Sequence, residues 1–232
     1  MDQIHRMLID VQKNPSALIG KPSLNRLFYF YNAFAYQFHK LGYTSCIISD
    51  FQKYIQKKYR MNADHHWAKI ISFFCISDEQ AFYEFYKHLE KFFEEYANWS
   101  CPEKENTLST DTTTDSLLYM EIETIRKQPE LFLGTQSLEG LYANLCGYNY
   151  FLDRNTAPTN SLFPDFTKFI QNKFHIYTPN HSWADILLFI YPLDSKAFSM
   201  FYTYWDEFLT TAGTSRPSQT SAVGRYRTNT TD

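Results

Sequence analysis

Glycine is scarce in this sequence, and the short motifs that mark common enzymes are missing from it. Only 7 of the 232 residues are glycine, whereas 21 are phenylalanine and 18 are tyrosine. Few glycines and many large side chains disfavour a turn-rich β-sandwich and favour helices that pack bulky faces together. No GxSxG, GxxxxGKS/T, HExxH or GxGxxG motif occurs, so the common nucleophile, phosphate, zinc and dinucleotide sites are not indicated. We expect no cofactor and no metal.

Long apolar runs, paired cysteines and a basic net charge are absent as well. No window holds 18 consecutive apolar residues, and the first residues lack the continuous apolar core of a signal peptide. The four cysteines show no CxxC spacing, which is typical of reduced thiols inside a cell. A net charge of −3 argues against non-specific nucleic-acid binding. We therefore expect a cytoplasmic protein that binds neither nucleic acid nor membrane.

The most informative feature that is present is an internal duplication. Four blocks recur in the same order, and the spacing between copies drifts only from 114 to 116 residues. Chance similarity would not keep four blocks in order, so the pattern indicates two copies of one unit. The matched blocks are 15–27 with 129–141, 50–58 with 165–173, 65–73 with 181–189, and 78–86 with 194–202.

The duplication and the helical spacing of apolar residues predict an all-α protein with two tandem homologous domains of about five helices each. Residues 1–97 form the first predicted domain, and residues 117–210 form the second. The segment 98–116 is rich in Ser, Thr, Asp and Glu, which is the composition of a solvated linker. Residues 211–232 have no apolar period and are predicted to be a disordered tail.

Several helix ends can be predicted from local chemistry. Ser23 and Ser137 precede the second helix of each copy and are predicted N-caps, because a serine oxygen accepts a hydrogen bond from a free first-turn amide. Gly20 and Gly134 are placed in a connecting turn with positive φ. Asp50 is predicted to cap the third helix.

The fourth segment of each copy, 67–76 and 183–191, is apolar on nearly every side. Such a run also fits a buried strand, because periodicity alone does not separate the two. Its length and the capping pattern of Ser182 with Asp185 favour a central helix.

The last helix of each copy is predicted to begin at Asp78 or Asp194 and to carry an apolar stripe. Most aromatic rings at helical spacing are expected in the core. We expect Tyr36, Tyr43 and Tyr150 to be partly exposed, where tyrosine favours protein–protein contact.

The best candidate for chemistry is the run Asp64, His65 and His66. Only His65 recurs in the second copy, as His181, where it stands beside Asn180 rather than an acid. A metal site needs three or four converging ligands, and nucleophilic catalysis needs a base within reach of the nucleophile. We therefore predict that these histidines cap the following helix and pack beside its tryptophan.

The repeated pattern resembles a family of bacterial immunity proteins found beside polymorphic toxins, including Rhs-type and type VI-delivered effectors. The shared features are a Pro-x4-Gly-x2-Ser-Leu-x2-Leu element, an aromatic helix, a His-x-Trp start and a closing Asp-x2-Ala-Phe-x2-Phe helix. The resemblance implies a protein that protects the producing cell by binding a toxin, and it implies no catalytic residues. The matching positions are 15–27, 51–59, 65–73 and 78–93, and again 129–141, 166–174, 181–189 and 194–208.

We therefore predict a non-enzymatic inhibitor that occludes the active site or the substrate surface of a cognate toxin. Tight inhibition of this kind needs an interface of roughly 1,600 Å² with aromatic anchors. Two alternatives stay open. One is a hydrolase-like enzyme that uses His65 or His181 to reverse a toxin's modification, and the other is a general helical adaptor.

The uneven charge gives a prediction for the partner-binding residues. Residues 1–100 hold 12 Lys or Arg and 10 Asp or Glu, whereas residues 101–210 hold 7 and 14. An acidic second copy suits a basic effector domain as partner. The predicted contact residues are Glu139, Asp153 and Asp185, which replace Asn25, His39 and Lys69 of the first copy.

Overall fold

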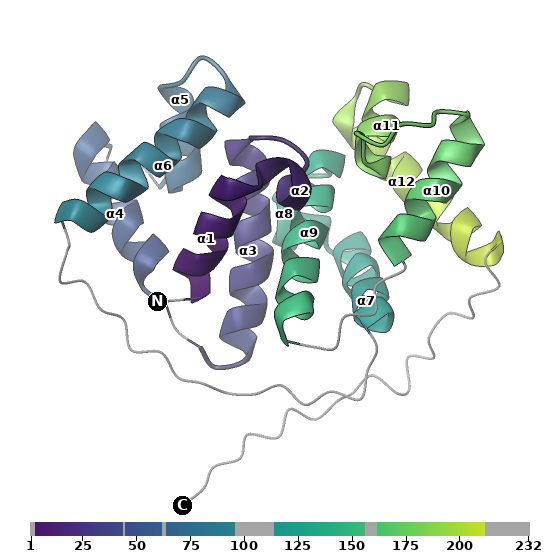
Figure 1. Ribbon diagram of the computed structural model, residues 1–232, viewed down its shortest axis with the longest axis horizontal. Coiled ribbons are helices and arrows are strands. Elements are labelled where there is room, and N and C mark those ends of the chain that lie inside the picture. Colours follow the sequence, from purple (N-terminus) through teal and green to yellow (C-terminus); the bar gives the residue numbers. More distant parts are fainter. Residues whose placement is uncertain (1–2, 44, 62–63, 96–113, 156–161, 212–232) are drawn as a thin grey trace, which may run out of the picture.

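A computed structural model describes residues 3–43, 45–61, 64–95, 114–155 and 162–211, and within these ranges every regular element is a helix (Figure 1). The predicted all-α class is therefore confirmed. None of the helices in these ranges has the length and apolarity to cross a membrane. The helices are α1 (Gln3–Lys13), α2 (Pro15–Ile19), α3 (Leu24–Lys40), α4 (Ile47–Tyr59), α5 (Trp67–Phe73), α6 (Asp78–Glu95), α7 (Thr114–Lys127), α8 (Pro129–Leu133), α9 (Leu138–Asn155), α10 (Leu162–Phe174), α11 (Trp183–Ile190) and α12 (Asp194–Thr211).

The helices α1–α6, here called the first half, recur in the same order as α7–α12, the second half. The start of α2 precedes that of α8 by 114 residues, and the start of α6 precedes that of α12 by 116. Each half has six described helices rather than about five, because Pro15 and Pro129 each begin a short helix where a turn was expected. Proline suits a first helical position, since its missing N–H would be unpaired there anyway.

The division into two domains stays a prediction. Most of the proposed linker, 98–113, and nearly all of the proposed tail, 212–232, lie outside the described residues. Thr114 already begins α7, three residues before the expected start of the second copy, and Thr211 ends α12.

Each half buries one tryptophan against phenylalanines at matching places. Trp67 and Trp183 are both 2% exposed. The ring centroids of each tryptophan and of the facing phenylalanine on the last helix are 4.8 Å apart in both halves. A phenylalanine of α4 or α10 meets this pair edge-on. The six rings are Phe51, Trp67 and Phe85 in the first half and Phe166, Trp183 and Phe201 in the second.

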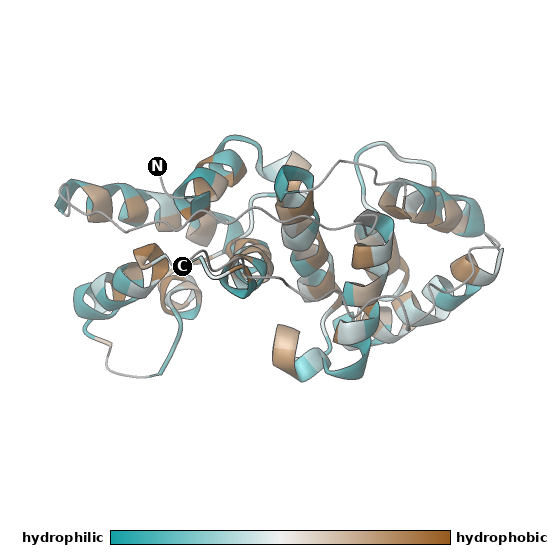
Figure 2. Ribbon diagram, turned by 90° about the horizontal axis from the view of Figure 1, so that it is seen from below, coloured by the Kyte–Doolittle hydropathy of each residue, from teal (hydrophilic) through white to brown (hydrophobic). Residues whose placement is uncertain are grey.

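A buried tyrosine ties the last helix of each half to its first helix. The Tyr86 hydroxyl donates to the Leu8 carbonyl at 2.9 Å, and the Tyr202 hydroxyl donates to the Ile122 carbonyl at 3.3 Å. The matching rings and hydrogen bonds show that the two halves use the same interior contacts. Figure 2 shows why these helices turn one side inward, since hydrophobic and hydrophilic residues alternate along most of them.

The predicted helix ends are mostly confirmed. The Ser23 hydroxyl accepts from the Arg26 amide at 3.0 Å, and the Ser137 hydroxyl accepts from the Gly140 amide at 2.9 Å. Gly20 has φ of 84° and Gly134 has φ of 71°, so both connecting turns use the left-handed region as predicted.

The aspartates that begin α6 and α12 also hold the first turn of a central helix. Asp78 accepts from the Asn25 amide at 2.9 Å. Asp194 accepts from the amides of Leu138 and Glu139 at 2.8 and 3.2 Å. A carboxylate at these free N–H groups also faces the positive end of the helix dipole. The predicted starts at Asp78 and Asp194 are confirmed.

Two local predictions are wrong. Asp50 does not cap α4, because that helix begins at Ile47 and Asp50 lies inside its first turn. Tyr43 and Tyr150 are buried, at 6% and 8% exposed, whereas Tyr36 is 47% exposed as expected. Tyr150 is covered because α3 lies against α9, a contact between halves that helical spacing does not reveal.

The fourth segments are helices, as favoured over strands. They are shorter than the apolar runs, since α5 ends at Phe73 and α11 ends at Ile190. The Ser182–Asp185 capping box is present in full, with the Asp185 carboxylate accepting from the Ser182 amide at 2.9 Å.

The helices α3 and α9 lie side by side at the centre and contact each other more extensively than any other pair (Figure 1). They run in the same direction. Arg26 near the start of α3 contacts Glu139 near the start of α9, and Phe34 towards the end of α3 contacts Phe151 towards the end of α9. The two halves are therefore joined along the length of equivalent helices.

One buried acid makes the stability of the fold depend on pH. Glu121 on α7 is 9% exposed, and it occupies the position that Met7 has in the first half. Burial raises the pKa of the Glu121 carboxyl from its usual 4.5 to about 7, an effect that Lys40 partly opposes. The folded state therefore holds this proton more tightly than the unfolded state does.

We expect Glu121→Gln to stabilise the protein at neutral and higher pH relative to its effect in acid. Below pH 4.5 the carboxyl is protonated in both states and its raised pKa has no effect on stability. Between pH 4.5 and 7 the unfolded state loses this proton while the folded state keeps it, so the wild type loses stability over that range, and the variant should be ahead by about 2–3 kcal/mol at pH 8. Chemical denaturation at pH 4 and pH 8 measures this. The exposed Glu130→Gln is the control, and an equal gain for both variants at pH 8 would contradict the assignment.

Candidate functional site

Large apolar side chains are exposed at the two corners where α5 meets α6 and where α11 meets α12. The first apolar corner consists of Phe73, Phe74 and Ile76, of which Ile76 is 98% exposed and Phe73 is 75% exposed. The second apolar corner consists of Phe189 and Leu193, at 76% and 68%. Phe73 and Phe189 match at a spacing of 116 residues, so each half presents a phenylalanine at the same place.

Both apolar corners lie on the same long side of the molecule. In the view of Figure 1 they are at the upper left and upper right, on either side of the N-terminal ends of α3 and α9. Sequence reasoning missed them because the fourth segments were expected to be buried. The length of the apolar run could have indicated them, because the run 67–76 is longer than the helix that it forms. The helix α5 has 7 residues and ends at Phe73, so Phe74 and Ile76 lie beyond its buried face.

Between the corners, Arg26 forms a charged junction that joins the two halves. Its guanidinium is 1% exposed and donates to Glu139 and Asp185, each at 3.0 Å, and to the Ile19 carbonyl at 3.1 Å. It also lies over the Tyr142 ring, 5.2 Å from the centroid. Each of the three guanidinium nitrogens therefore donates to an oxygen, and one face of the group lies against a ring.

The charges in this arginine junction stabilise one another. Burial acts to lower the pKa of Arg26, but the hydrogen bonds and charges of Asp185 and Glu139 outweigh it and raise the pKa. Burial acts to raise the pKa of Asp185 and Glu139, and their partners lower both below the usual range. Lys21 adds a second cation 3.1 Å from Glu139.

The structure brings together two of the three predicted contact residues. Glu139 and Asp185 meet at Arg26, where their side chains keep 26% and 24% exposure. Asp153 is exposed at the far end of α9, and its carboxylate accepts from the side-chain amide of Asn149 at 3.1 Å. Contact of these three residues with a partner stays a prediction. Part of the acidic excess of the second half therefore pairs with cations of the first half.

The counterparts of these acids in the first half have other roles. The backbone N–H of Asn25 donates to the Asp78 carboxylate, and His39 Nδ1 lies 3.0 Å from the Tyr43 carbonyl oxygen. Lys69 is exposed on α5. None of the three makes a matching ion pair with the second half among the described contacts.

The three candidate histidines have different surroundings. His66 caps α5 by accepting from the Lys69 amide at 3.1 Å, as predicted, and its ring stacks on Phe28 at 4.0 Å. Burial, Lys69 and His65 lower the pKa of His66. The capping prediction is wrong for the other two, because His65 contributes only its carbonyl, to a hydrogen bond from Gln52, and His181 is exposed while Ser182 caps α11. Within the described ranges no three His, Cys, Asp or Glu side chains are grouped so that they could hold a metal ion.

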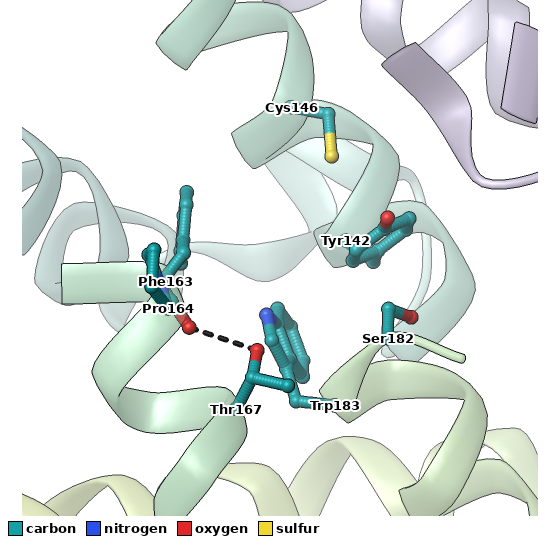
Figure 3. A pocket seen from close by; sticks show the side chains of 7 residues that line it. All are labelled: Tyr142, Cys146, Phe163, Pro164, Thr167, Ser182 and Trp183. Carbon is teal, nitrogen blue, oxygen red and sulfur yellow. Dashed lines mark hydrogen bonds between the residues drawn. The ribbon is translucent and has the colours of Figure 1, made fainter. Parts of the chain in front are cut away.

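Beside the arginine junction lies a pocket of about 250 Å³ (Figure 3). Its walls come from α9, α10 and the start of α11, and they are mostly apolar. Cys146 is part of the wall, and burial raises the pKa of its thiol to about 12, so the thiol stays protonated at neutral pH. The lining residues are Tyr142, Cys146, Phe163, Pro164, Thr167, Ser182 and Trp183.

The apolar corners, the arginine junction between them and the pocket beside that junction together form the candidate site. The site can bind, since it offers rings, aliphatic groups and fixed charges. Comparison with protein-family models, with curated proteins and with solved structures finds no match to this chain.

Proposed function

We propose that this chain is an immunity protein of bacterial competition, which acts in the cytoplasm by binding a toxin and covering its active site or substrate surface. The observation that carries the proposal is the pair of matching apolar corners on one side of a helical scaffold. The resemblance of the repeated sequence to toxin-associated immunity proteins supports the same function.

The exposure of the apolar corners supports a binding role on physical grounds. Scattered exposed apolar residues are common, but gathered ones mark interaction sites. When a partner covers exposed phenylalanine and isoleucine side chains, their apolar surface is removed from water. Each Å² that is buried in this way contributes about 25 cal/mol to the binding free energy. Two anchors spread over one face also fit an interface of standard size, in which a few apolar residues supply most of the affinity.

The charges support a partner with a basic surface. The second half carries the acidic excess of the sequence. Because Glu139 and Asp185 are largely neutralised by Arg26 and Lys21, the remaining steering comes from other acids of that half, such as Asp153. We therefore assign affinity to the apolar corners and the association rate to the acidic excess.

Co-expression in a bacterium with the toxin encoded directly upstream of the gene tests this function. The wild-type chain should restore growth. The double variants Phe73→Ser/Ile76→Ser and Phe189→Ser/Leu193→Ser should weaken toxin binding about 30-fold or more, because truncation of a central anchor typically costs at least about 2 kcal/mol. Both should keep the fold, since the side chains that they remove are exposed.

The controls separate this function from its alternatives. Tyr36→Ser removes an exposed ring of α3 away from the corners and should protect like the wild type. His65→Asn/His181→Asn should also protect. Loss of protection by the histidine variant, with binding and fold intact, would favour the enzyme. Full protection by both corner variants would refute the binding face.

A further inference from the structure

The pocket in Figure 3 has the size and lining of a site for one ring. Its volume of about 250 Å³ is below the roughly 300–1,000 Å³ of pockets that hold drug-sized ligands. Three of its walls are aromatic, from Tyr142, Phe163 and Trp183. Tyr142 and Trp183 contact each other edge-on, with centroids 5.5 Å apart, and both line the pocket.

The first half shows what fills the matching place there. Thr167 corresponds to Gln52, and Ser182 corresponds to His66, so the second half has the smaller side chain at both positions. Gln52 spans from the Trp67 amide at 2.5 Å to the His65 carbonyl at 2.9 Å. At a third lining position the order is reversed, since Phe163 of the second half corresponds to Ile48 of the first.

The most specific part of this difference is a stacked ring. In the first half the His66 imidazole lies on Phe28, with centroids 4.0 Å apart and an angle of 14° between the rings. Tyr142 is the counterpart of Phe28, and Ser182 replaces the imidazole with a hydroxymethyl group. The first half therefore has a stacked imidazole at the position where the second half has only a hydroxymethyl group.

Both hydroxyl groups that Thr167 and Ser182 bring to the pocket are engaged within the chain. The Thr167 hydroxyl donates to the Phe163 carbonyl at 2.8 Å, and the Ser182 hydroxyl donates to Asp185 at 2.7 Å. The nearby charge of Arg26 is balanced by Asp185 and Glu139. The pocket thus offers apolar surface without a net charge, which matches an uncharged aromatic ring rather than an ion.

We propose that this pocket binds a single uncharged aromatic ring, and that in the inhibited complex the ring is a side chain of the toxin. The pocket lies beside the arginine junction, since its wall includes the Tyr142 ring beneath Arg26 and the Ser182 hydroxyl that donates to Asp185. The second part of this proposal rests on the proposed function. The first part does not.

Free ring compounds test the pocket on the purified full-length chain. We expect p-cresol or indole to bind at one site in ligand-observed NMR, with a dissociation constant on the order of 1 mM for so few atoms. Thr167→Gln and Ser182→His restore the larger groups of the first half and should each weaken binding at least tenfold. Ser195→His, the same change at an exposed position of α12, should have no effect.

The reverse exchange provides a gain of binding. Gln52→Thr/His66→Ser gives the first half the smaller side chains of the second, and serine is itself a good N-cap for α5. This variant should bind two ring molecules per chain instead of one. The pocket assignment is overturned if neither probe binds the wild type, or if both filled variants bind as the wild type does while circular dichroism shows them folded.

Toxin binding by the same variants tests the second part. Thr167→Gln and Ser182→His should weaken the complex at least tenfold, and Ser195→His should not. If ring binding is lost in the filled variants but toxin binding is unchanged, the toxin does not use the pocket and this part is wrong. If the wild type binds rings but not the toxin, the proposed function fails while the ring site stands.

Discussion

Replacing Gly147 with alanine is expected to lower the free energy of unfolding by at least about 3 kcal/mol, although alanine is intrinsically the better helix former by about 1 kcal/mol. A Cβ at Gly147 would lie 2.2 Å from the carbonyl oxygen of Phe30 and 2.8 Å from its carbonyl carbon. These are backbone atoms of α3, so no side-chain rotation relieves the contact. The central helices must separate, and the core contacts between the halves are lost with them.

Gly140→Ala in the same helix is the matched control. A Cβ there would lie 3.2 Å from ring atoms of Tyr29 and 3.2 Å from the Ser137 hydroxyl, and side chains can adjust. Urea denaturation of the two variants compares them directly, and the change at Gly140 should stay within about 1 kcal/mol. Equal, small effects at both positions would show that α3 and α9 do not approach as closely as described.

The second large effect is expected at Arg26. Arg26→Met keeps most of the buried side-chain volume but removes the cation between Glu139 and Asp185. Removal of one partner from a buried ion pair typically destabilises by about 3–5 kcal/mol. Because both acids are about a quarter exposed, water relieves part of this, and we expect a loss of about 2–3 kcal/mol.

Two comparisons make the Arg26 experiment specific. Lys21→Met removes the exposed cation of the same junction and should cost less than about 1 kcal/mol. Adding Glu139→Gln and Asp185→Asn to Arg26→Met should recover part of the stability, since no acid is then left without its cation. If Arg26→Met is as mild as Lys21→Met, the junction does not hold the halves together.

Contacts within one helix could be predicted from the sequence. The caps at Ser23, Ser137 and Ser182 depend on a hydroxyl and an amide three residues apart, so local spacing suffices. The same is true of the left-handed turns at Gly20 and Gly134. The duplication strengthened these predictions, because an element seen twice is less easily a coincidence.

Contacts between the halves could not be predicted in this way. Arg26 and Asp185 are 159 residues apart along the chain, and nothing in their local sequence shows that they meet. The acids Glu139 and Asp185 therefore looked like surface charges, although they serve the junction. Tyr150 looked exposed for the same reason, because α3 covers it only in the folded molecule.

The comparison of the two halves separates positions that report the fold from positions that change what each copy presents. Core positions such as Trp67 and Trp183 keep the same role, and they report the fold. Exchanges such as His66 for Ser182 and Lys69 for Asp185 change what the two copies present. Only a structure shows that the first exchange borders a pocket and that the second creates an ion pair across the halves.

The most direct test of the proposed function is a titration of the purified toxin's activity with the purified chain. Inhibition by occlusion predicts that toxin activity falls in proportion to the chain added, reaches its minimum at a fixed molar ratio and does not deepen with longer incubation. The Phe73→Ser/Ile76→Ser variant should shift this titration to much higher concentration. Inactivation of many toxin molecules by one chain, or restoration of a modified target with no effect on the toxin, would contradict occlusion and indicate an enzyme.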